Sequence, residues 1–176
     1  GGLDTEQNYS SNLYKIDTLT SNVEYIDLSN ISILSGIYNH SMVVIDTDIY
    51  IFGGTTNGTA YLNDLYKITT VTSNIEKINL TQNLSPIYDH SMVVIGPDIY
   101  IYGKKRDYSF NVLYKIDTVS SNIVDIPLRD TQNNVVGFSM VEIKNDIYIF
   151  GGSNEGGVVT NDLYKIDISG NSKKIG

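Results

Sequence analysis

The sequence predicts an all-β fold made of one unit that recurs about every 50 residues, each unit being a four-stranded antiparallel sheet. Three short sequence motifs, which we call words, support this prediction because they recur in the same order along the chain. They are Leu-Tyr-Lys-Ile with its tyrosine at Tyr14, Tyr66, Tyr114 and Tyr164, Ser-Met-Val starting at Ser41, Ser91 and Ser139, and Asp-Ile-Tyr-Ile-Phe/Tyr-Gly ending at Gly53, Gly103 and Gly151. Repetition with this period is typical of repeat architectures. No segment has helical periodicity over a useful length.

The order of elements is clearest in the unit that starts at Ser41. A first strand is expected over 41–45 and a second over 49–52, with a tight Asp-Thr-Asp turn between them. A polar loop then leads to a third strand over 65–68, and a Ser/Thr/Asn turn leads to a fourth over 75–78. Asp, Asn, Gly and Ser favour such turns because they stabilise tight backbone conformations.

The polarity of the strands changes in a fixed direction within each unit. The first two strands are apolar on both faces, so both faces need cover. The third strand alternates around Lys67, and the fourth carries Glu76 and Lys77, charges that protect an exposed sheet edge. We therefore expect burial to fall from the first strand at the centre to the fourth at the rim, as in a radial stack of sheets. The sequence predicts a β-propeller arc of about three and a half blades, forming one segment over 1–176 with a partial blade at 1–28 and blades at 41–80, 91–128 and 139–175.

These words resemble the kelch repeat. The run from His40 to Val44, followed by the run from Ile49 to Gly54, matches its pattern, and the run from Ile147 to Gly152 matches its second half. The tryptophan that kelch repeats usually carry at the start of the fourth strand is replaced by Val23, Ile75 and Ile123, and a tyrosine late in the third by Ile16, Ile68, Ile116 and Ile166. The resemblance implies a ring of six or seven blades. We therefore expect the remaining blades to come from the parent chain or from another copy, because an open arc would expose large apolar faces.

Composition excludes several classes of partner. Twenty acidic and 12 basic residues give a net charge of −8, which argues against binding to nucleic acid or to an anionic membrane. No apolar run approaches the roughly 18 residues of a membrane-spanning helix. The chain has no cysteine, which removes thiolate ligands and nucleophiles. No compartment is indicated.

Two sets of recurring polar residues receive structural interpretations. His40 and His90 share one repeat position and could form a metal pair, but Phe138 stands at that position in the next unit. The recurring hairpin aspartates are expected to cap their turns, and they are Asp48, Asp98 and Asp146. No metal site and no cofactor are predicted.

The candidates for partner binding lie where one unit departs from the others. Lys104, Lys105 and Arg106, with Tyr108 close behind, form the only basic cluster, at a point where Gly-Gly becomes Gly-Lys and the following loop is two residues shorter. A solvated charged loop is the alternative interpretation, although loops often carry function.

Tyr38 and Tyr88 in the connections between units are further candidates, since tyrosine is a favoured interface residue. Kelch domains that capture acidic peptides use arginines in this connection. The matching positions here are Ile37, Ile87 and Val135, so that mode of binding is not expected.

The predicted function is a non-enzymatic scaffold for protein interaction. The alternative is a carbohydrate-active or carbohydrate-binding propeller whose site is completed by blades outside this chain. Kelch-type copper radical oxidases need a cysteine, and sialidases need three arginines. This chain has no cysteine and only Arg106 and Arg129, so no complete enzymatic site is predicted from its own residues.

Overall fold

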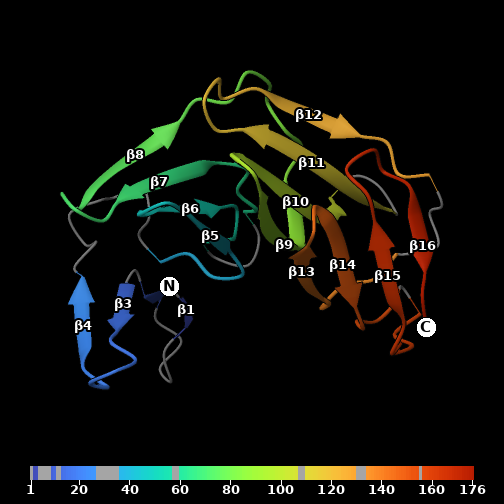
Figure 1. Cartoon of the computed structure of the whole chain (residues 1–176), viewed down its shortest axis with the longest axis horizontal. Coiled ribbons are helices and arrows are strands. Elements are labelled where there is room, and N and C mark those ends of the chain that lie inside the picture. The colour runs from blue at the N-terminus through green and yellow to red at the C-terminus, as the bar shows by residue number, and fades with distance from the viewer. Residues whose placement is uncertain are drawn as a thin grey trace.

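The computed structural model describes residues 2–3, 9–10, 13–26, 36–56, 60–106, 110–129, 134–154 and 156–176. All regular elements within these ranges are β-strands, which confirms the all-β prediction. They form three four-stranded and two two-stranded antiparallel sheets, arranged as an arc of blades (Figure 1). The arc is open, and none of the sheets closes on itself.

The blades follow one another along the chain. Blade I contains β5 (Ser41–Ile45), β6 (Asp48–Phe52), β7 (Leu65–Thr69) and β8 (Asn74–Ile78). Blade II contains β9 (Ile87–Ile95), β10 (Asp98–Lys105), β11 (Asn111–Asp117) and β12 (Ile123–Ile126). Blade III contains β13 (Ser139–Ile143), β14 (Asp146–Phe150), β15 (Leu163–Ile166) and β16 (Ser172–Lys174). A half blade of β3 (Leu13–Ile16) and β4 (Val23–Ile26) precedes them, after the short pair β1 (Gly2–Leu3) and β2 (Tyr9–Ser10).

Within each full blade the spatial order of the strands equals their order in the chain. The first strands β5, β9 and β13 gather in the middle of the fan, and the fourth strands β8, β12 and β16 form the rim (Figure 1). The Ser-Met-Val segments therefore lie at the inner edge, as predicted. In blade II the first strand begins at Ile87 rather than Ser91, because Tyr88 and Ile87 continue to pair with Lys104 and Lys105 beyond a bulge.

The expectation that the first strand is the most buried is wrong. Burial is greatest in the second and third strands, where Ile99, Ile101 and Leu113 are fully buried. By contrast, Met42 and Val44 of β5 are more than half exposed. The inner strand borders the open middle of the arc, so only the inner strand of a neighbouring blade can cover it. The described part of the half blade supplies only outer strands on that side.

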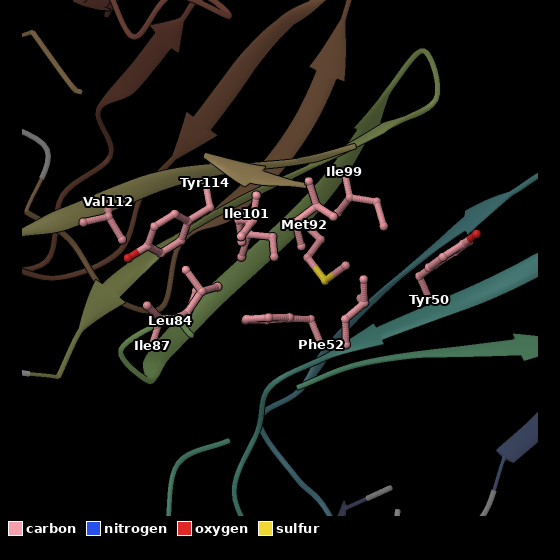
Figure 2. Close-up of a cluster of buried hydrophobic side chains, with 12 residues drawn as sticks. Tyr50, Phe52, Leu84, Ile87, Met92, Ile99, Ile101, Val112 and Tyr114 are labelled. Atoms are coloured by element: carbon pink, nitrogen blue, oxygen red, sulfur yellow. The ribbon is translucent and has the colours of Figure 1, made fainter. Parts of the chain in front are cut away.

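The hydrophobic core lies between blades. Phe52 of blade I packs against Met92 and Ile101 of blade II in the cluster shown in Figure 2. A second cluster joins blade II to blade III, and a third joins the half blade to blade I. Because burying one large apolar side chain contributes about 1.5–3 kcal/mol, each boundary between blades is a separate source of stability.

Backbone contacts at the rim also join consecutive blades. Thr81, just after β8, donates its amide to the carbonyl of Ser121 at 3.2 Å and its hydroxyl to Asn122 Oδ1 at 2.9 Å. At the next boundary the amide of Arg129 donates to the carbonyl of Gly170 at 2.9 Å. In each of these rim contacts, the segment after one blade's fourth strand meets the outer turn of the next blade.

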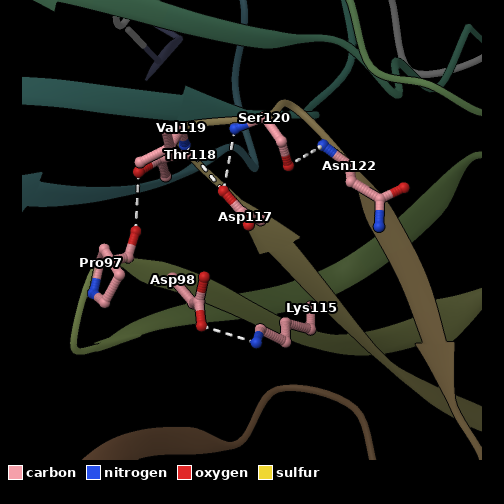
Figure 3. A network of polar contacts seen from close by, with 8 residues as sticks. All are labelled: Pro97, Asp98, Lys115, Asp117, Thr118, Val119, Ser120 and Asn122. Carbon is pink, nitrogen blue, oxygen red and sulfur yellow. Dashed lines mark hydrogen bonds and ion pairs between the residues drawn. The ribbon is translucent and has the colours of Figure 1, made fainter.

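The hairpin aspartates have a role that differs from the expected turn capping. Asp98 pairs with Lys115 of the Leu-Tyr-Lys-Ile word at 2.7 Å (Figure 3). Equivalent ion pairs recur in the other full blades, at 2.9 Å for Lys67–Asp48 and 2.6 Å for Lys165–Asp146. The aspartate at the start of the second strand is thus held by the lysine of the third strand, and the bond to Asp98 raises the pKa of Lys115.

The turn after the third strand is instead capped by an aspartate at the end of that strand or directly after it. Asp117 Oδ1 accepts the amides of Val119 and Ser120, both at 2.9 Å (Figure 3). Asp17 and Asp167 accept amides in the same way in their own blades. These backbone donors stabilise the carboxylate, so they lower the pKa of Asp117 below its ordinary value.

Candidate partner-binding site

All the partner-binding candidates belong to one end of the sheets. Because neighbouring strands are antiparallel, the loop after each second strand and the connection after each fourth strand leave from the same end. We call this end of the arc the loop face. Lys104, Lys105, Arg106, Tyr38 and Tyr88 are placed there, whereas Tyr108 lies outside the described residues.

Two residues of the basic segment belong to a strand rather than to a charged loop. Lys104 and Lys105 are half-buried residues of β10 rather than loop residues, and Lys104 lies opposite Tyr88 as Thr55 lies opposite Tyr38. One glycine, Gly103, stands at the bulge where blade I has two. The loop is shorter because β10 and β11 remain paired further toward their ends.

Arg106 forms a cluster with two tyrosines across the boundary between blades I and II. Its guanidinium carbon lies 5.6 Å from the ring centroid of Tyr61, and the Tyr61 ring lies 5.3 Å from the Tyr88 ring with a 36° tilt. The amide of Arg106 donates to the carbonyl of Pro86 at 3.0 Å, which fixes the position of its backbone. We call Tyr61, Tyr88 and Arg106 the Arg106 cluster.

The Arg106 side chain is exposed and forms no ion pair with another described residue. Its stacking on Tyr61 restricts the guanidinium without neutralising it. A cation stacked on an aromatic ring is stabilised by roughly 0.5–1 kcal/mol at an exposed site. The donors of the guanidinium can therefore bind a polar group from outside the chain.

Sequence reasoning missed Tyr61. A signal was available, since a tyrosine stands five residues before the Leu-Tyr-Lys-Ile tyrosine in two units, at Tyr9 and Tyr61. Within its own unit, however, Tyr61 lies in a loop that the sequence predicts to be a polar connection. The cluster is formed by residues from two blades, so no single repeat contains it.

Tyr38 and Lys105 lie apart from the Arg106 cluster. Tyr38 and Thr55 exchange backbone hydrogen bonds of 3.1 and 2.9 Å next to the half blade. The ammonium of Lys105 lies 5.8 Å from the ring centroid of Tyr114. The structure therefore joins two of the sequence-predicted candidates, Tyr88 and Arg106, through Tyr61.

His90 has a structural environment. Its Nε2 lies 3.0 Å from the carbonyl oxygen of Phe52, and its ring meets the Phe52 ring edge-on at 5.5 Å. Burial lowers the pKa of His90 and also that of His40, which favours neutral imidazoles. Within the part of the chain that the structure describes, no three His, Cys, Asp or Glu side chains gather as metal ligands would.

The positions that hold arginine in acidic-peptide-binding kelch domains are part of the core here. Ile37, Ile87 and Val135 are all buried. Ile37 belongs to the cluster between the half blade and blade I, and Ile87 to the cluster between blades I and II. These side chains are thus used for packing.

The successive four-stranded sheets, with first strands at the centre and cores between blades, define an open segment of a β-propeller. A family model described as the KLHDC2/KLHL20/DRC7 Kelch-repeats domain matches residues 1–133, and the Kelch motif matches residues 135–172. The chain belongs to the kelch-repeat family.

Solved structures show the same fold. In all, 158 chains match, and one of them, described as "Structure of YjhT", has a TM-score of 0.79 at 17% identity. The match covers 99% of this chain and 61% of that chain, so the present chain spans less than two thirds of the length of that propeller. A search of curated proteins found no match. Within the described residues there is no helix long and apolar enough to cross a membrane.

Proposed function

We propose that this propeller segment is a non-enzymatic scaffold that binds a protein partner through the Arg106 cluster on its loop face. The observation that supports the proposal most strongly is the exposed Arg106 guanidinium, stacked on Tyr61 and forming no ion pair with a described residue. Arginine and tyrosine are enriched among residues that dominate binding energy in protein interfaces. Stacking also reduces the conformational freedom that the side chain would lose on binding.

The position of the cluster supports the same proposal. Two of its members come from blade II and one from blade I, and the core between these blades includes fully buried side chains from both. A rigid support keeps the contact residues in a binding geometry before the partner arrives, which lowers the entropic cost of association.

A matched pair of charge deletions tests the proposal. Proteins captured by the wild-type chain are compared with those captured by Arg106→Ala and by Lys173→Ala, which removes one exposed positive charge from blade III instead. The protein lost only with Arg106→Ala is then titrated by calorimetry. We expect its affinity to fall at least about tenfold with Arg106→Ala and with Tyr88→Ala, and to stay within about twofold with Lys173→Ala.

If no captured protein depends on Arg106, or if the purified partner binds Arg106→Ala as it binds wild type, the proposal is wrong. Circular dichroism of the variants separates lost binding from lost folding. A glycan array probed with the same variants tests the carbohydrate alternative, for which binding would be to sugar and independent of a protein partner.

We further propose that additional kelch blades cover the two ends of this arc. Val141, Ile143 and Phe150 of blade III, and Tyr14 and Ile16 of the half blade, are about half exposed or more. Apolar faces of this kind are rare on soluble monomers. Three and a half blades at 61% coverage of the YjhT chain scale to about six blades, on the order of a closed ring.

Light scattering after size exclusion tests the ring proposal. We expect this chain alone to self-associate through its bare faces, and Phe150→Ser with Val141→Thr to reduce that association. A compact and soluble monomer of the unmodified chain would contradict the proposal.

A further inference from the structure

Blade II has an apolar hollow where the two other full blades have an ion pair. In blade I, Lys77 and Asp64 join the two outer strands at the loop face at 2.7 Å, and in blade III Lys174 and Asp162 do so at 2.8 Å. The register places Val112 and Asp125 at these positions in blade II. The lysine is thus replaced by a carboxylate, and the carboxylate by an apolar side chain.

At this place blade II has a cavity of about 360 Å³, within the range of ligand sites. The corresponding cavity in blade I has about 200 Å³ and includes the ion pair in its walls. Apolar side chains line most of the blade II cavity, namely Phe110, Val112, Ile126, Pro127 and Leu128. Phe110 is 44% exposed, so part of the apolar lining faces solvent. We call this cavity the blade II hollow.

One charged group in the hollow lacks a counterpart. Asp125 lines it and forms no ion pair with any residue of the described ranges. Lys105 also lines the hollow, with its ammonium over the Tyr114 ring at 5.8 Å. A ligand complementary to this lining therefore has an apolar group that packs on the apolar side chains and a cation that pairs with Asp125.

We propose that the blade II hollow binds a partner polypeptide through an aliphatic side chain followed by a lysine or arginine. The aliphatic side chain fills the space above Val112, and the cation pairs with Asp125 as Lys77 pairs with Asp64 in blade I. The site is separate from the Arg106 cluster, so the inference does not depend on the function proposed above.

A peptide titration tests this inference with the full chain. The probe is the peptide Ser-Gly-Leu-Lys-Gly-Ser, followed by amide chemical shifts in nuclear magnetic resonance spectra of the labelled protein. We expect shifts at Val112, Asp125, Ile126 and Leu128. Replacing the peptide leucine by alanine should weaken binding about tenfold, because alanine leaves most of the apolar lining uncovered.

Two protein variants separate charge from shape. Val112→Asp with Asp125→Lys recreates the ion pair of blades I and III and should weaken peptide binding at least about tenfold, since it removes both the apolar floor and the carboxylate. Asp125→Asn keeps the shape and should weaken binding by about threefold, typical of one exposed ion pair. Arg106→Ala should leave peptide binding unchanged, which keeps this test distinct from that of the Arg106 cluster.

The inference fails if the peptide causes no shifts around the hollow, or if a peptide with glutamate in place of lysine binds equally well. It also fails if the double variant binds like wild type. Should the double variant not fold, Asp125→Asn and the peptide series still decide, because Asp125→Asn preserves the side-chain shape.

Discussion

Blades II and III carry nearly the same side chains on the sheet face that looks toward the following blade, and these side chains have opposite environments. In blade II, Val93 is 7% exposed and Tyr102 is fully buried against blade III. In blade III the matching Val141 and Phe150 are each 53% exposed. The residues are alike and the neighbours differ. Burial in this fold therefore depends on two neighbouring blades together. The same substitution at one repeat position is expected to lower the free energy of unfolding by different amounts in different blades.

The largest expected effect compares this position between the two blades. Tyr102→Ala should lower the free energy of unfolding by about 3–5 kcal/mol, because it empties a filled site between two blades. Phe150→Ala should cost about 1 kcal/mol or less at protein concentrations low enough to keep the chain monomeric, as is usual for a substitution outside a packed core. Urea denaturation followed by circular dichroism measures both.

Equal costs for the two variants would mean that blade III is covered in solution. In that case the midpoint of unfolding should rise with protein concentration. In a longer protein that completes the ring, the cost of Phe150→Ala should approach that of Tyr102→Ala.

A smaller effect is expected at the rim contact that holds blade III against blade II. Gly170 has a φ of +84°, and a Cβ added there would overlap the carbonyl oxygen of Pro127. Gly157 has a φ of +73° and open space around it. Both alanine variants should lose about 1 kcal/mol from the left-handed backbone, and Gly170→Ala roughly 1–3 kcal/mol more from the overlap.

Thermal unfolding of Gly170→Ala and Gly157→Ala measures this difference. If the two melting temperatures are equal, the close approach of the blade III turn to Pro127 does not contribute to docking. Gly157 is the appropriate control because it shares the backbone strain without the contact.

The smallest effect concerns the histidine position, where blade II has His90 and blade III has Phe138. Burial keeps the folded pKa of His90 below its unfolded value near 6.5, so the unfolded chain binds the proton more readily. The stability contributed by neutral His90 is complete above the unfolded pKa and is lost as pH falls through the folded pKa. His90→Phe should therefore flatten the fall in unfolding free energy as the pH drops through the unfolded pKa near 6.5 and below it.

Denaturation at several pH values tests this prediction, with His40→Phe as the matched variant. Burial also lowers the pKa of His40, so each variant should remove part of the slope. An unchanged slope in both variants would assign the pH dependence to other groups.

Much of the fold followed from the sequence, because a strand is specified by local apolar patterns that recur with the period. The inner position of Ser41, Ser91 and Ser139 was correct for this reason. The burial gradient was wrong because the cover of Met42 and Val44 depends on a neighbouring inner strand. The Asp98–Lys115 ion pair was missed because its partners are on different strands, brought together by register.

The candidate site was less predictable than the fold. Arg106 stood out as a basic departure from the repeat, and Tyr88 as an interface residue. Their connection through Tyr61 depends on how two blades are rotated against each other, and no pattern within one unit encodes that rotation. The paired part of β10 was missed because a bulge with one glycine in place of two changes the register without changing the words.

The rim contacts run in one direction, from the segment after a fourth strand to the turn of the following blade. Chains are made from the amino terminus, and earlier parts fold first. When each new blade leaves the ribosome, the sheet face against which it packs has already been synthesised. The backbone amide that donates a hydrogen bond to its outer turn has been synthesised as well. The blades can therefore fold in the order of translation, and each folded blade provides the packing surface for the next.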